Sequence, residues 1–520
     1  MRFTYIDQFK NLIKNNLFYF ISTVVFLLFI ALVIRYQIYL LNFRAWEDES
    51  DSIVIVKMIA SGKYLYSEIF SIHGFFHLLP GILLEKINHF GIHTHRIFIL
   101  IIQLLALSSI YFSPLLKNRY VSKIYVFFAA TFILLCLPKF YSYTYTYQTV
   151  AAFLLLIILA QYVLPSISCP ERLKTKQIFI GNFLIACLPF IAISYLPIAL
   201  LFSVGAYRKR YFKTITISLL TGLSLNILLL ILIGSFIGFY VFHIYMNISI
   251  MPLYSSQEWP TTFIQVITNT LIFSTKNLSG FITSFIILIF SINYFFKEKL
   301  FLWTSLLGWR VAIVYVGILS LLIRGADFHG LPYYTSLITV PLLLLKNKTY
   351  QGFILDRKKI TLILSIVLII FIKLSIVLPS DLIKFKSQSL QKDSEFSKLV
   401  HLVTNKNDKI VAYSFRNLEY INSERLPVSG YFTYLPMQDK YNENPKFGIK
   451  IDGCKDIEIY KPKIMLVDKL NMWGRFPWES YGTCVQRILD KDYIRIRDRD
   501  YYLRKDIYRQ YRSVIPALLS

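Results

Sequence analysis

The sequence is poor in charged residues and lacks the short signatures of several common protein classes. Charged residues make up 17% of its 520 residues and apolar residues 55%, which excludes an ordinary soluble globular protein. The chain has no internal repeat, no low-complexity tract and no glycine-rich phosphate loop, so a nucleotide site built on such a loop is excluded as well. The composition indicates a polytopic membrane protein.

Acidic residues are scarce relative to basic ones, and the formal net charge is +26. A strongly basic chain can bind nucleic acid, but here the basic residues form short clusters between apolar stretches. This pattern marks cytoplasmic loops of membrane proteins. No nucleic-acid partner is therefore expected, and the clusters can be used to orient the spans.

Alternating apolar stretches and basic clusters predict about eleven spans. No small-residue cleavage site follows the first stretch, so we expect an uncleaved span that enters from the cytoplasm. Residues Ile69–Gly91 are apolar but broken by polar residues and proline, which favours an interfacial or re-entrant segment. The predicted spans are Leu17–Ile34, Ile97–Phe112, Ile124–Leu137, Thr149–Leu164, two short helices within Ile178–Ala206 separated near Pro189 and Pro197, Thr214–Phe239, Leu278–Phe296, Leu300–Ile323, Tyr334–Leu345 and Ile360–Leu378.

The composition becomes polar and charged after the last predicted span. Residues 380–520 contain short β-like runs, at 410–413 and 464–467, which predict a small α/β extracytoplasmic domain following a transmembrane domain of residues 1–379. Only five cysteines occur in the chain, and Cys454 and Cys484 are the two in this domain. In an oxidising compartment such a pair is expected to form a disulfide.

The acidic cluster Trp46-Glu47-Asp48-Glu49-Ser50-Asp51 follows the first span. Carboxylates at a membrane surface are costly, and their presence points to a functional site. A solvated loop without chemistry is the alternative. We expect this cluster to lie on the outer side of the membrane, on the same side as the C-terminal domain.

The first loop resembles that of the GT-C membrane glycosyltransferases, in particular bacterial family 39-like enzymes related to protein O-mannosyltransferases and lipid A aminoarabinose transferases. The similarity lies in Asp48-Glu49, Gly62-Lys63-Tyr64-Leu65-Tyr66, Glu68 and His73-Gly74, with weaker similarity in Arg324 to Tyr334 and in Tyr493 to Asp506. The sequence departs from the family pattern at His73-Gly74-Phe75, where relatives have a Pro-Pro-like element. It also departs after the third span, where many relatives have a second acidic residue.

The resemblance implies transfer of a sugar from a polyprenyl-phosphate donor, with inversion, to an envelope acceptor. Asp48 would be the general base at the catalytic site and Glu49 its structural partner. Glu68 and His243 would be ligands of a divalent metal cation, although a capping or interfacial role for His243 is the alternative.

Donor phosphate binding requires cations near the outer surface. Arg324, Arg96 and Lys139 fall at outer ends of predicted spans, and guanidinium groups suit phosphate. Snorkelling to lipid headgroups is the alternative for each. The resemblance adds His329 and Tyr333, which belong to a His-Tyr element that such enzymes carry outside the membrane.

The sequence thus predicts an α-helical polytopic glycosyltransferase of the bacterial inner membrane, in contact with the lipid bilayer. Its N-terminus would be cytoplasmic and its C-terminal domain periplasmic. A lipid-linked glycan transporter or flippase, which would also need many spans and cationic groups, is one alternative. A non-catalytic envelope assembly protein is another, because the second acidic residue is missing.

Overall fold

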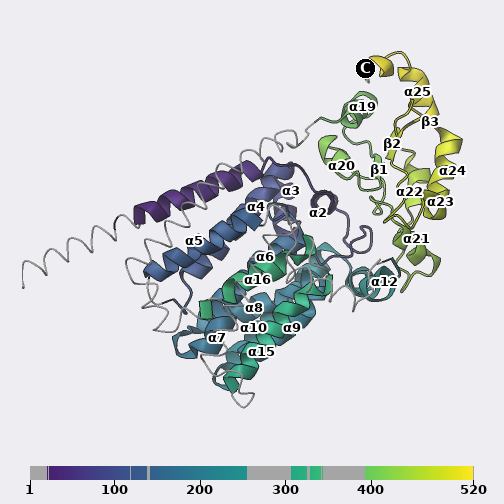
Figure 1. Ribbon diagram of the computed structural model, residues 1–520. Coiled ribbons are helices and arrows are strands. Elements are labelled where there is room, and N and C mark those ends of the chain that lie inside the picture. The colour runs from purple at the N-terminus through teal and green to yellow at the C-terminus, as the bar shows by residue number, and fades with distance from the viewer. Residues whose placement is uncertain are drawn as a thin grey trace, which may run out of the picture.

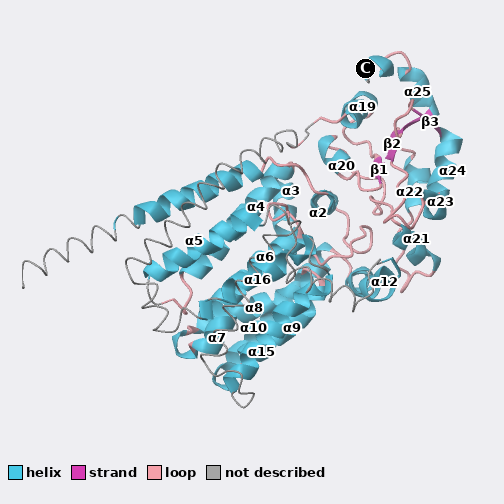
Figure 2. Cartoon of the chain, viewed as in Figure 1, coloured by secondary structure: helices cyan, strands magenta, loops and turns pink. Residues whose placement is uncertain are grey.

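The computed structural model describes residues 20, 23–116, 119–136, 141–254, 306–324, 328–340, 342–343, 390 and 393–518. A bundle of apolar helices forms one end of the molecule, and the C-terminal part (residues 393–518) lies at the other (Figure 1). Figure 2 shows that, among the described residues, the strands lie in the C-terminal part. The two regions meet around α2 and α12, where the candidate site lies.

The bundle is built from long helices joined by short ones. Its helices are Thr23–Leu40, α2 Glu47–Ala60, α3 Leu79–Ile87, α4 Ile92–Tyr111, α5 Arg119–Cys136, α6 Tyr147–Ile158, α7 Leu164–Ser168, α8 Thr175–Cys187, α9 Leu196–Ala206, α10 Phe212–Ile233, α11 Phe236–Phe239, α12 Met251–Tyr254, α15 Leu306–Ser320 and α16 Leu331–Thr339. Two π-helices, η3 Leu159–Val163 and η8 Tyr240–Ile250, continue α6 and α11. Short 3-10 turns are η1 Phe76–Leu78, η4 Pro170–Arg172, η5 Leu188–Phe190, η6 Ile193–Tyr195, η7 Lys209–Tyr211, η10 Leu321–Arg324 and η11 Phe328–Gly330.

The helices pack in a continuous apolar core. α10 runs along α8, α15 along α9, α16 along α6, and α4 contacts both α5 and α6. The helix Thr23–Leu40, purple in Figure 1, lies beside α4 and α5. Its Phe29 ring lies 3.9 Å from that of Phe127, and Lys123 Nζ donates to Thr23 Oγ1 over 2.6 Å.

Five of the described helical stretches are long and apolar enough to cross a membrane. They are Thr23–Leu40, Ile92–Tyr111, Tyr147–Ser168, Lys209–Ile233 and Phe236–Tyr254, with shorter apolar helices at Val121–Thr131, Thr175–Phe190, Ile193–Ala206 and Gly308–Ser320. Several apolar side chains of α10, such as Leu220, Leu228 and Leu232, are exposed on the surface, as lipid contact requires. The chain is that of a multi-pass membrane protein. The count of eleven spans stays a prediction, since Leu278–Phe296 and Ile360–Leu378 lie outside the described residues.

Two local predictions are confirmed. Residues 178–206 form two short helices, because α8 ends at Cys187 and α9 begins at Leu196 after the turns that contain Pro189. The segment 69–91 is no full span, since its longest helix, α3, has nine residues.

Two other predictions are wrong. The acidic cluster is not a loop, because it forms the first turn of α2. The predicted span Thr214–Phe239 breaks at Gly234, and the segment after Tyr240 continues as helix up to Tyr254. The break arises because Leu65 pairs with the chain there, donating to the Ile233 carbonyl and accepting from the Ser235 N–H.

The C-terminal part holds a four-stranded sheet of order β1-β2-β4-β3, in which β1 and β2 are parallel and the other pairs antiparallel. Its strands are β1 Val411–Tyr413, β2 Ile464–Val467, β3 Tyr493–Arg495 and β4 Tyr501–Arg504, and its helices are α19 Glu395–Val403, α20 Leu418–Asn422, α21 Pro436–Glu443, α22 Gly453–Tyr460, α23 Trp478–Tyr481, α24 Thr483–Asp492, α25 Lys505–Tyr511 and α26 Ile515–Leu518. Both predicted strand runs are confirmed, because β1 and β2 occupy them and are fully buried. The predicted domain boundary at 379/380 lies outside the described residues.

The two cysteines of this part are joined. Cys454 of α22 and Cys484 of α24 form a disulfide with their Cα atoms 6.3 Å apart, as the sequence predicts. The bridge ties α22 to α24 and encloses the loop that carries Trp473.

Candidate functional site

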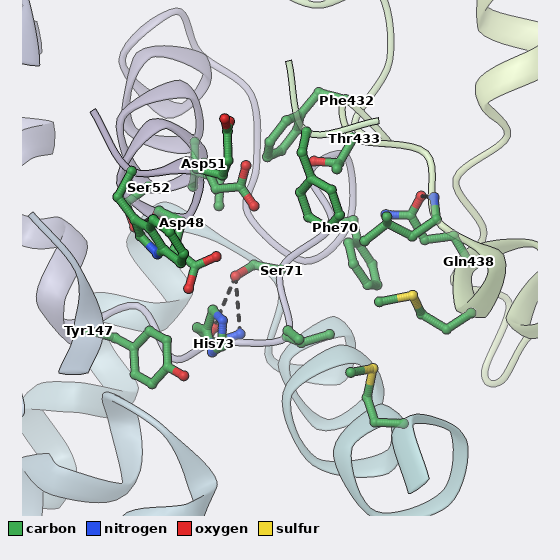
Figure 3. A pocket seen from close by; sticks show the side chains of 18 of the residues that line it. Asp48, Asp51, Ser52, Phe70, Ser71, His73, Tyr147, Phe432, Thr433 and Gln438 are labelled. Atoms are coloured by element: carbon green, nitrogen blue, oxygen red, sulfur yellow. Dashed lines mark hydrogen bonds between the residues drawn. The ribbon is translucent and has the colours of Figure 1, made fainter. Parts of the chain in front are cut away.

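A cavity of about 420 Å³ lies where the helical bundle meets the C-terminal part (Figure 3). One wall is the first turns of α2, a second is the segment 70–77, and a third comes from the C-terminal loops. The lining residues are Trp46, Glu47, Asp48, Asp51, Ser52, Ile55, Phe70, Ser71, Ile72, His73, His77, Tyr147, Met251, His329, Phe415, Phe432, Thr433, Leu435, Met437, Gln438 and Trp473.

Helix α2 presents its acidic residues to this cavity through its periodicity. Glu47, Asp48 and Glu49 occupy its first turn, where carboxylates are stabilised by the N-terminal end of the helix dipole. The residues at 48, 51, 52 and 55 line the cavity, and spacings of three and four place side chains on one helical face. A single helix thus delivers Asp48, Asp51 and Ser52 to the same cavity.

Asp48, the predicted base, points into the cavity. In Figure 3 its carboxylate is directed toward Ser71 and His73, while Asp51 lies nearer to Phe432 and Thr433. The ring of His73 stacks on that of Tyr147 at a centroid distance of 3.9 Å. An acceptor entering the cavity would therefore meet Asp48 beside polar and aromatic groups.

Glu49 does not line the cavity and points to another side of α2. Its carboxylate pairs with Arg96 of α4, with Nε to Oε1 at 2.8 Å and Nη2 to Oε2 at 2.5 Å, and both side chains are fully buried. Glu49 Oε1 also accepts from the N–H of Tyr145. These contacts enclose the Glu49 carboxylate, and its predicted role as the structural partner of Asp48 stays a prediction.

The segment 71–74 is held in place by contacts with Tyr66 and with the chain at Phe190 and Ile191. The Tyr66 hydroxyl donates to the His73 carbonyl over 2.7 Å, and the Gly74 N–H donates to the Ile191 carbonyl over 2.9 Å. A Cβ on Gly74 would lie 2.0 Å from the Phe190 carbonyl oxygen, which no side chain tolerates. Close backbone packing therefore requires a glycine at position 74.

The predicted metal ligands do not form a metal site. The two ring nitrogens of His243 lie 3.1 and 3.0 Å from the carbonyl oxygens of Ile72 and Pro189, so both are engaged with the backbone. Glu68 Oε2 accepts a hydrogen bond from the Tyr64 N–H, and Glu68 Oε1 lies 3.6 Å from Lys63 Nζ. Among the described residues no group of three or more His, Cys, Asp or Glu side chains has a metal-binding arrangement. These two residues do not fit a divalent cation, and His243 instead supports the cavity wall at Ile72.

The predicted phosphate ligands separate into three groups. Arg96 is a correction, because its guanidinium is buried against Glu49 and the carbonyls of Leu40, Leu41, Phe43 and Arg44, which leaves no face for a lipid phosphate. His329 lines the cavity, whereas Tyr333 is buried in α16 and is not part of the lining. Lys139 and the side chain of Arg324 lie outside the described residues.

Two cavity carboxyl groups, those of Glu47 and Asp51, have pKa values above their ordinary range. Loss of water raises the pKa of Glu47 to about 7, with Arg416 opposing the shift and Asp48 and Glu419 adding to it. Burial likewise raises the pKa of Asp51 well above its usual range. Burial lowers the pKa of His77 to about 3, so its ring is neutral at pH 7. Perturbed titration of several groups in one cavity is typical of functional sites.

Sequence reasoning missed several residues of this cavity. Asp51 belongs to the acidic cluster, and a helical reading of that cluster would have placed it on the face of Asp48. Thr433 and Trp473 come from distant loops and Gln438 from α21, and nothing local in the sequence marks them. Asn417 was missed for the same reason, although its amide Nδ2 donates to Asp51.

Comparisons with known proteins give only distant similarity. No family model and no curated protein matches the chain. Among solved structures, it is similar to the archaeal oligosaccharyltransferase AglB from Archaeoglobus fulgidus in complex with an inhibitory peptide and a dolichol-phosphate, with 11% identity, a TM-score of 0.44, and coverage of 85% of this chain and 69% of that one. A structure of the Archaeoglobus fulgidus oligosaccharyltransferase in complex with Zn and sulfate gives 11% identity, a TM-score of 0.44, and coverage of 84% and 67%. At this level of similarity no activity carries over, and function is argued from the cavity.

Proposed function

We propose that the protein is an integral membrane glycosyltransferase that moves a sugar from a polyprenyl-phosphate donor to a hydroxyl group of an envelope acceptor. The observation that carries this proposal is the cavity at the end of an apolar helix bundle, into which α2 directs Asp48. A donor with a lipid tail and a polar head needs such a site, with apolar helices beside a polar cavity. The sequence resemblance of the first loop points to the same chemistry.

The proposed reaction is a direct displacement at the anomeric carbon. The acceptor oxygen forms a bond to that carbon while the bond from carbon to the phosphate oxygen breaks, and the electron pair leaves with polyprenyl phosphate. Asp48 takes the acceptor proton, which makes the attacking oxygen a better nucleophile. Inversion at the carbon follows from a single displacement. No step is assigned to a metal ion, because Glu68 and His243 do not fit one.

Binding of the donor phosphate is assigned to Arg324, Lys139 and His329. Of these, His329 has a supporting position, since it lines the cavity with Asp48. A charge-assisted contact to phosphate contributes about 1.5–3 kcal/mol. Arg324→Ala is therefore expected to raise the KM for the lipid donor more than kcat changes.

The proposed orientation places the N-terminus in the cytoplasm and both the cavity and the C-terminal part outside, at the bacterial inner membrane. Reporters fused after Trp46, Tyr145, Tyr254 and Ser380 should read outside, and fusions after Arg119, Lys174, Arg208, Lys299 and Lys348 inside. A pair reading the reverse way would show that the spans are counted wrongly.

A transporter for lipid-linked glycans is supported less well. Alternating access requires polar groups along a path through the membrane. The carboxyl groups of the cavity, Glu47, Asp48 and Asp51, lie at one end of the bundle, beside the C-terminal part. A non-catalytic assembly protein would not need Asp48 in a cavity, and the activity test below distinguishes it.

The test is release of polyprenyl phosphate from polyprenyl-phosphate sugars by the purified protein. Asp48→Asn keeps the shape of the side chain but cannot accept the proton, and loss of a general base typically lowers rates about 10²–10⁴-fold. Asp498→Asn, an exposed position in the C-terminal part, is the matched control and should leave the rate unchanged. Equal rates for Asp48→Asn and wild type would refute the proposal, and so would an absence of release in wild type across the available sugar donors.

A further inference from the structure

One buried side chain of the C-terminal part contacts the side of α2 that carries Asp48 and Asp51. Asn417, the residue before α20, donates from Nδ2 to Asp51 Oδ1 across 366 positions of sequence. The same nitrogen lies 3.2 Å from Thr433 Oγ1, a second cavity residue. Asn417 is fully buried, so this contact is enclosed and not a surface encounter.

Three carboxyl groups crowd this end of α2, and Arg416, the cation that acts on Glu47, pairs with Asp468. Asp48 and Asp51 lie three positions apart on one helical face, where like charges repel. Glu47 is a third carboxyl group of the cavity, and the described lining contains no lysine or arginine. A phosphate-bearing donor would bring a further negative charge. Binding of such a donor is favoured if one of the carboxyl groups is protonated and can donate a hydrogen bond.

Asp51 is the carboxyl group best placed to carry that proton. Burial is the main cause that raises its pKa, and Asp48 and Glu47 add to the effect, whereas the hydrogen bond from Asn417 opposes it. Asn417 engages one of its two oxygens, so the position of the carboxyl group is fixed while it lines the cavity. The titratable and charged groups of the neighbouring elements are Glu47 and Asp48 on α2, His73 and His77 on the segment beside it, His329 of η11, and Arg416, Glu419 and Tyr420 around α20.

We infer that Asn417 is a positioning residue that fixes the Asp51 carboxyl group in the cavity, and that Asp51, in its neutral form, donates a hydrogen bond to the phosphate of the lipid donor while Asp48 acts as base. This inference rests on the proposed function. It places in α2, one turn after Asp48, the second acidic residue that the loop after the third predicted span lacks. It also makes the C-terminal part a component of the site, because that part supplies the residue that positions Asp51.

The experiment measures release of polyprenyl phosphate by the full-length protein as a function of pH. If neutral Asp51 is the active form, the rate falls at alkaline pH as Asp51 ionises. Asn417→Ala removes a hydrogen bond that favours the ionised form of Asp51. Asp51 then stays protonated to higher pH, and the fall in rate occurs at a higher pH than in wild type. Asp51→Asn cannot ionise, so the alkaline fall disappears, while the plateau rate drops because an amide is a weaker donor. Asp51→Ala has no side-chain group that can donate a hydrogen bond. It should therefore raise the KM for the lipid substrate more than Asp51→Asn does.

Two controls separate this effect from general damage. Asn444→Ala, at an exposed asparagine of the C-terminal part, should keep the wild-type rate and profile. Glu47→Gln should leave the alkaline fall in place, and its removal by this variant would assign the titration to Glu47 and overturn the inference. Protease resistance of each variant shows that it is folded.

Two further outcomes would also overturn the inference. One is that the rate of folded Asn417→Ala falls at the same alkaline pH as the rate of wild type. The other is a uniform loss of rate at all pH values in folded Asp51→Asn, which would show that the site needs the ionised carboxylate. Either result, together with an inactive Asp48→Asn, would leave the proposed function intact, whereas an active Asp48→Asn would remove the proposed function itself.

Discussion

Arg96 and Glu49, 47 positions apart in sequence, form a fully buried ion pair that ties α4 to α2. Arg96 also donates to the carbonyls of Phe43 and Arg44, and so holds the chain where it enters α2. Successive helical residues point about 100° apart. Fixing Glu49 on the buried side therefore determines that Asp48 faces the cavity.

Glu49→Gln is expected to destabilise the fold rather than remove the chemistry. It leaves Arg96 buried beside a neutral amide, and breaking a buried ion pair typically costs about 3–5 kcal/mol. Thermal unfolding in detergent should show a large decrease in the melting temperature. The protein that remains folded should retain more activity than Asp48→Asn does.

The matched control is Glu443→Gln, which breaks the exposed pair of Lys440 and Glu443 in α21. Solvent and salt screen an exposed pair, so the melting temperature should hardly change. Similar effects of the two variants would show that the buried pair has no special role.

Features that depend on local sequence could be predicted, and the structure confirms them. Apolar runs located α4, α5 and α6, because a helix in an apolar environment needs a continuous apolar surface. Prolines located the break between α8 and α9, since proline removes a backbone donor. Buried strands such as β1 and β2 were visible as short β-branched and aromatic runs.

Features that depend on distant contacts could not be predicted. The break after Ile233 occurs because Leu65 pairs with the chain there, and Gly234, one of three glycines in the apolar run, does not by itself mark it. The pairing of Arg96 with Glu49 turned a predicted lipid-phosphate ligand into a structural residue. Contacts such as that of Asn417 with Asp51 join residues from opposite ends of the chain, and no local pattern encodes them.

The pH dependence of stability should report Glu47. Its pKa is raised from about 4.5 to about 7 in the folded state, so the folded protein binds this proton more tightly than the unfolded chain. Stability contributed by this proton is present below about pH 4.5 and is lost as pH rises through about 7. Glu47→Gln removes the titration, so it should be more stable than wild type above pH 7 and equal to it in acid.

Melting temperatures measured across this range for wild type and variant give the comparison. Glu479→Gln, at an exposed position of α23, serves as the control and should follow the wild-type curve throughout. A constant difference between Glu47→Gln and wild type at every pH would argue against the raised pKa.

Gly74→Ala should disturb the cavity wall. The added Cβ would lie 2.0 Å from the Phe190 carbonyl oxygen, and neither backbone can move away without breaking the hydrogen bond from Gly74 to Ile191. Overpacking of this kind typically costs about 1–3 kcal/mol and displaces its neighbours, which here include His73. We expect lower stability together with lower activity per folded molecule.

Gly91→Ala is the control, because a Cβ at Gly91 meets nothing within 4 Å and its φ is −83°. Its activity should match that of wild type. Normal stability and activity in Gly74→Ala would mean that the segment 71–74 relaxes at no cost, and the assigned role of its backbone contacts would then be wrong.

The disulfide should stabilise the C-terminal part specifically. Cys454 and Cys484 enclose a loop with a sequence separation of 30, for which the chain-entropy model gives about 3–4 kcal/mol. Cys454→Ser should therefore make the C-terminal part sensitive to protease at concentrations that wild type resists, while the helix bundle stays intact. Limited proteolysis followed by mass spectrometry locates the first cuts, and wild type treated with a reductant should give the same pattern.

Since Trp473 lies in the enclosed loop and lines the cavity, the KM of the Cys454→Ser variant for the lipid donor should also rise. First cuts in the bundle, or a digestion pattern unchanged from wild type, would show that the bridge does not hold this part together.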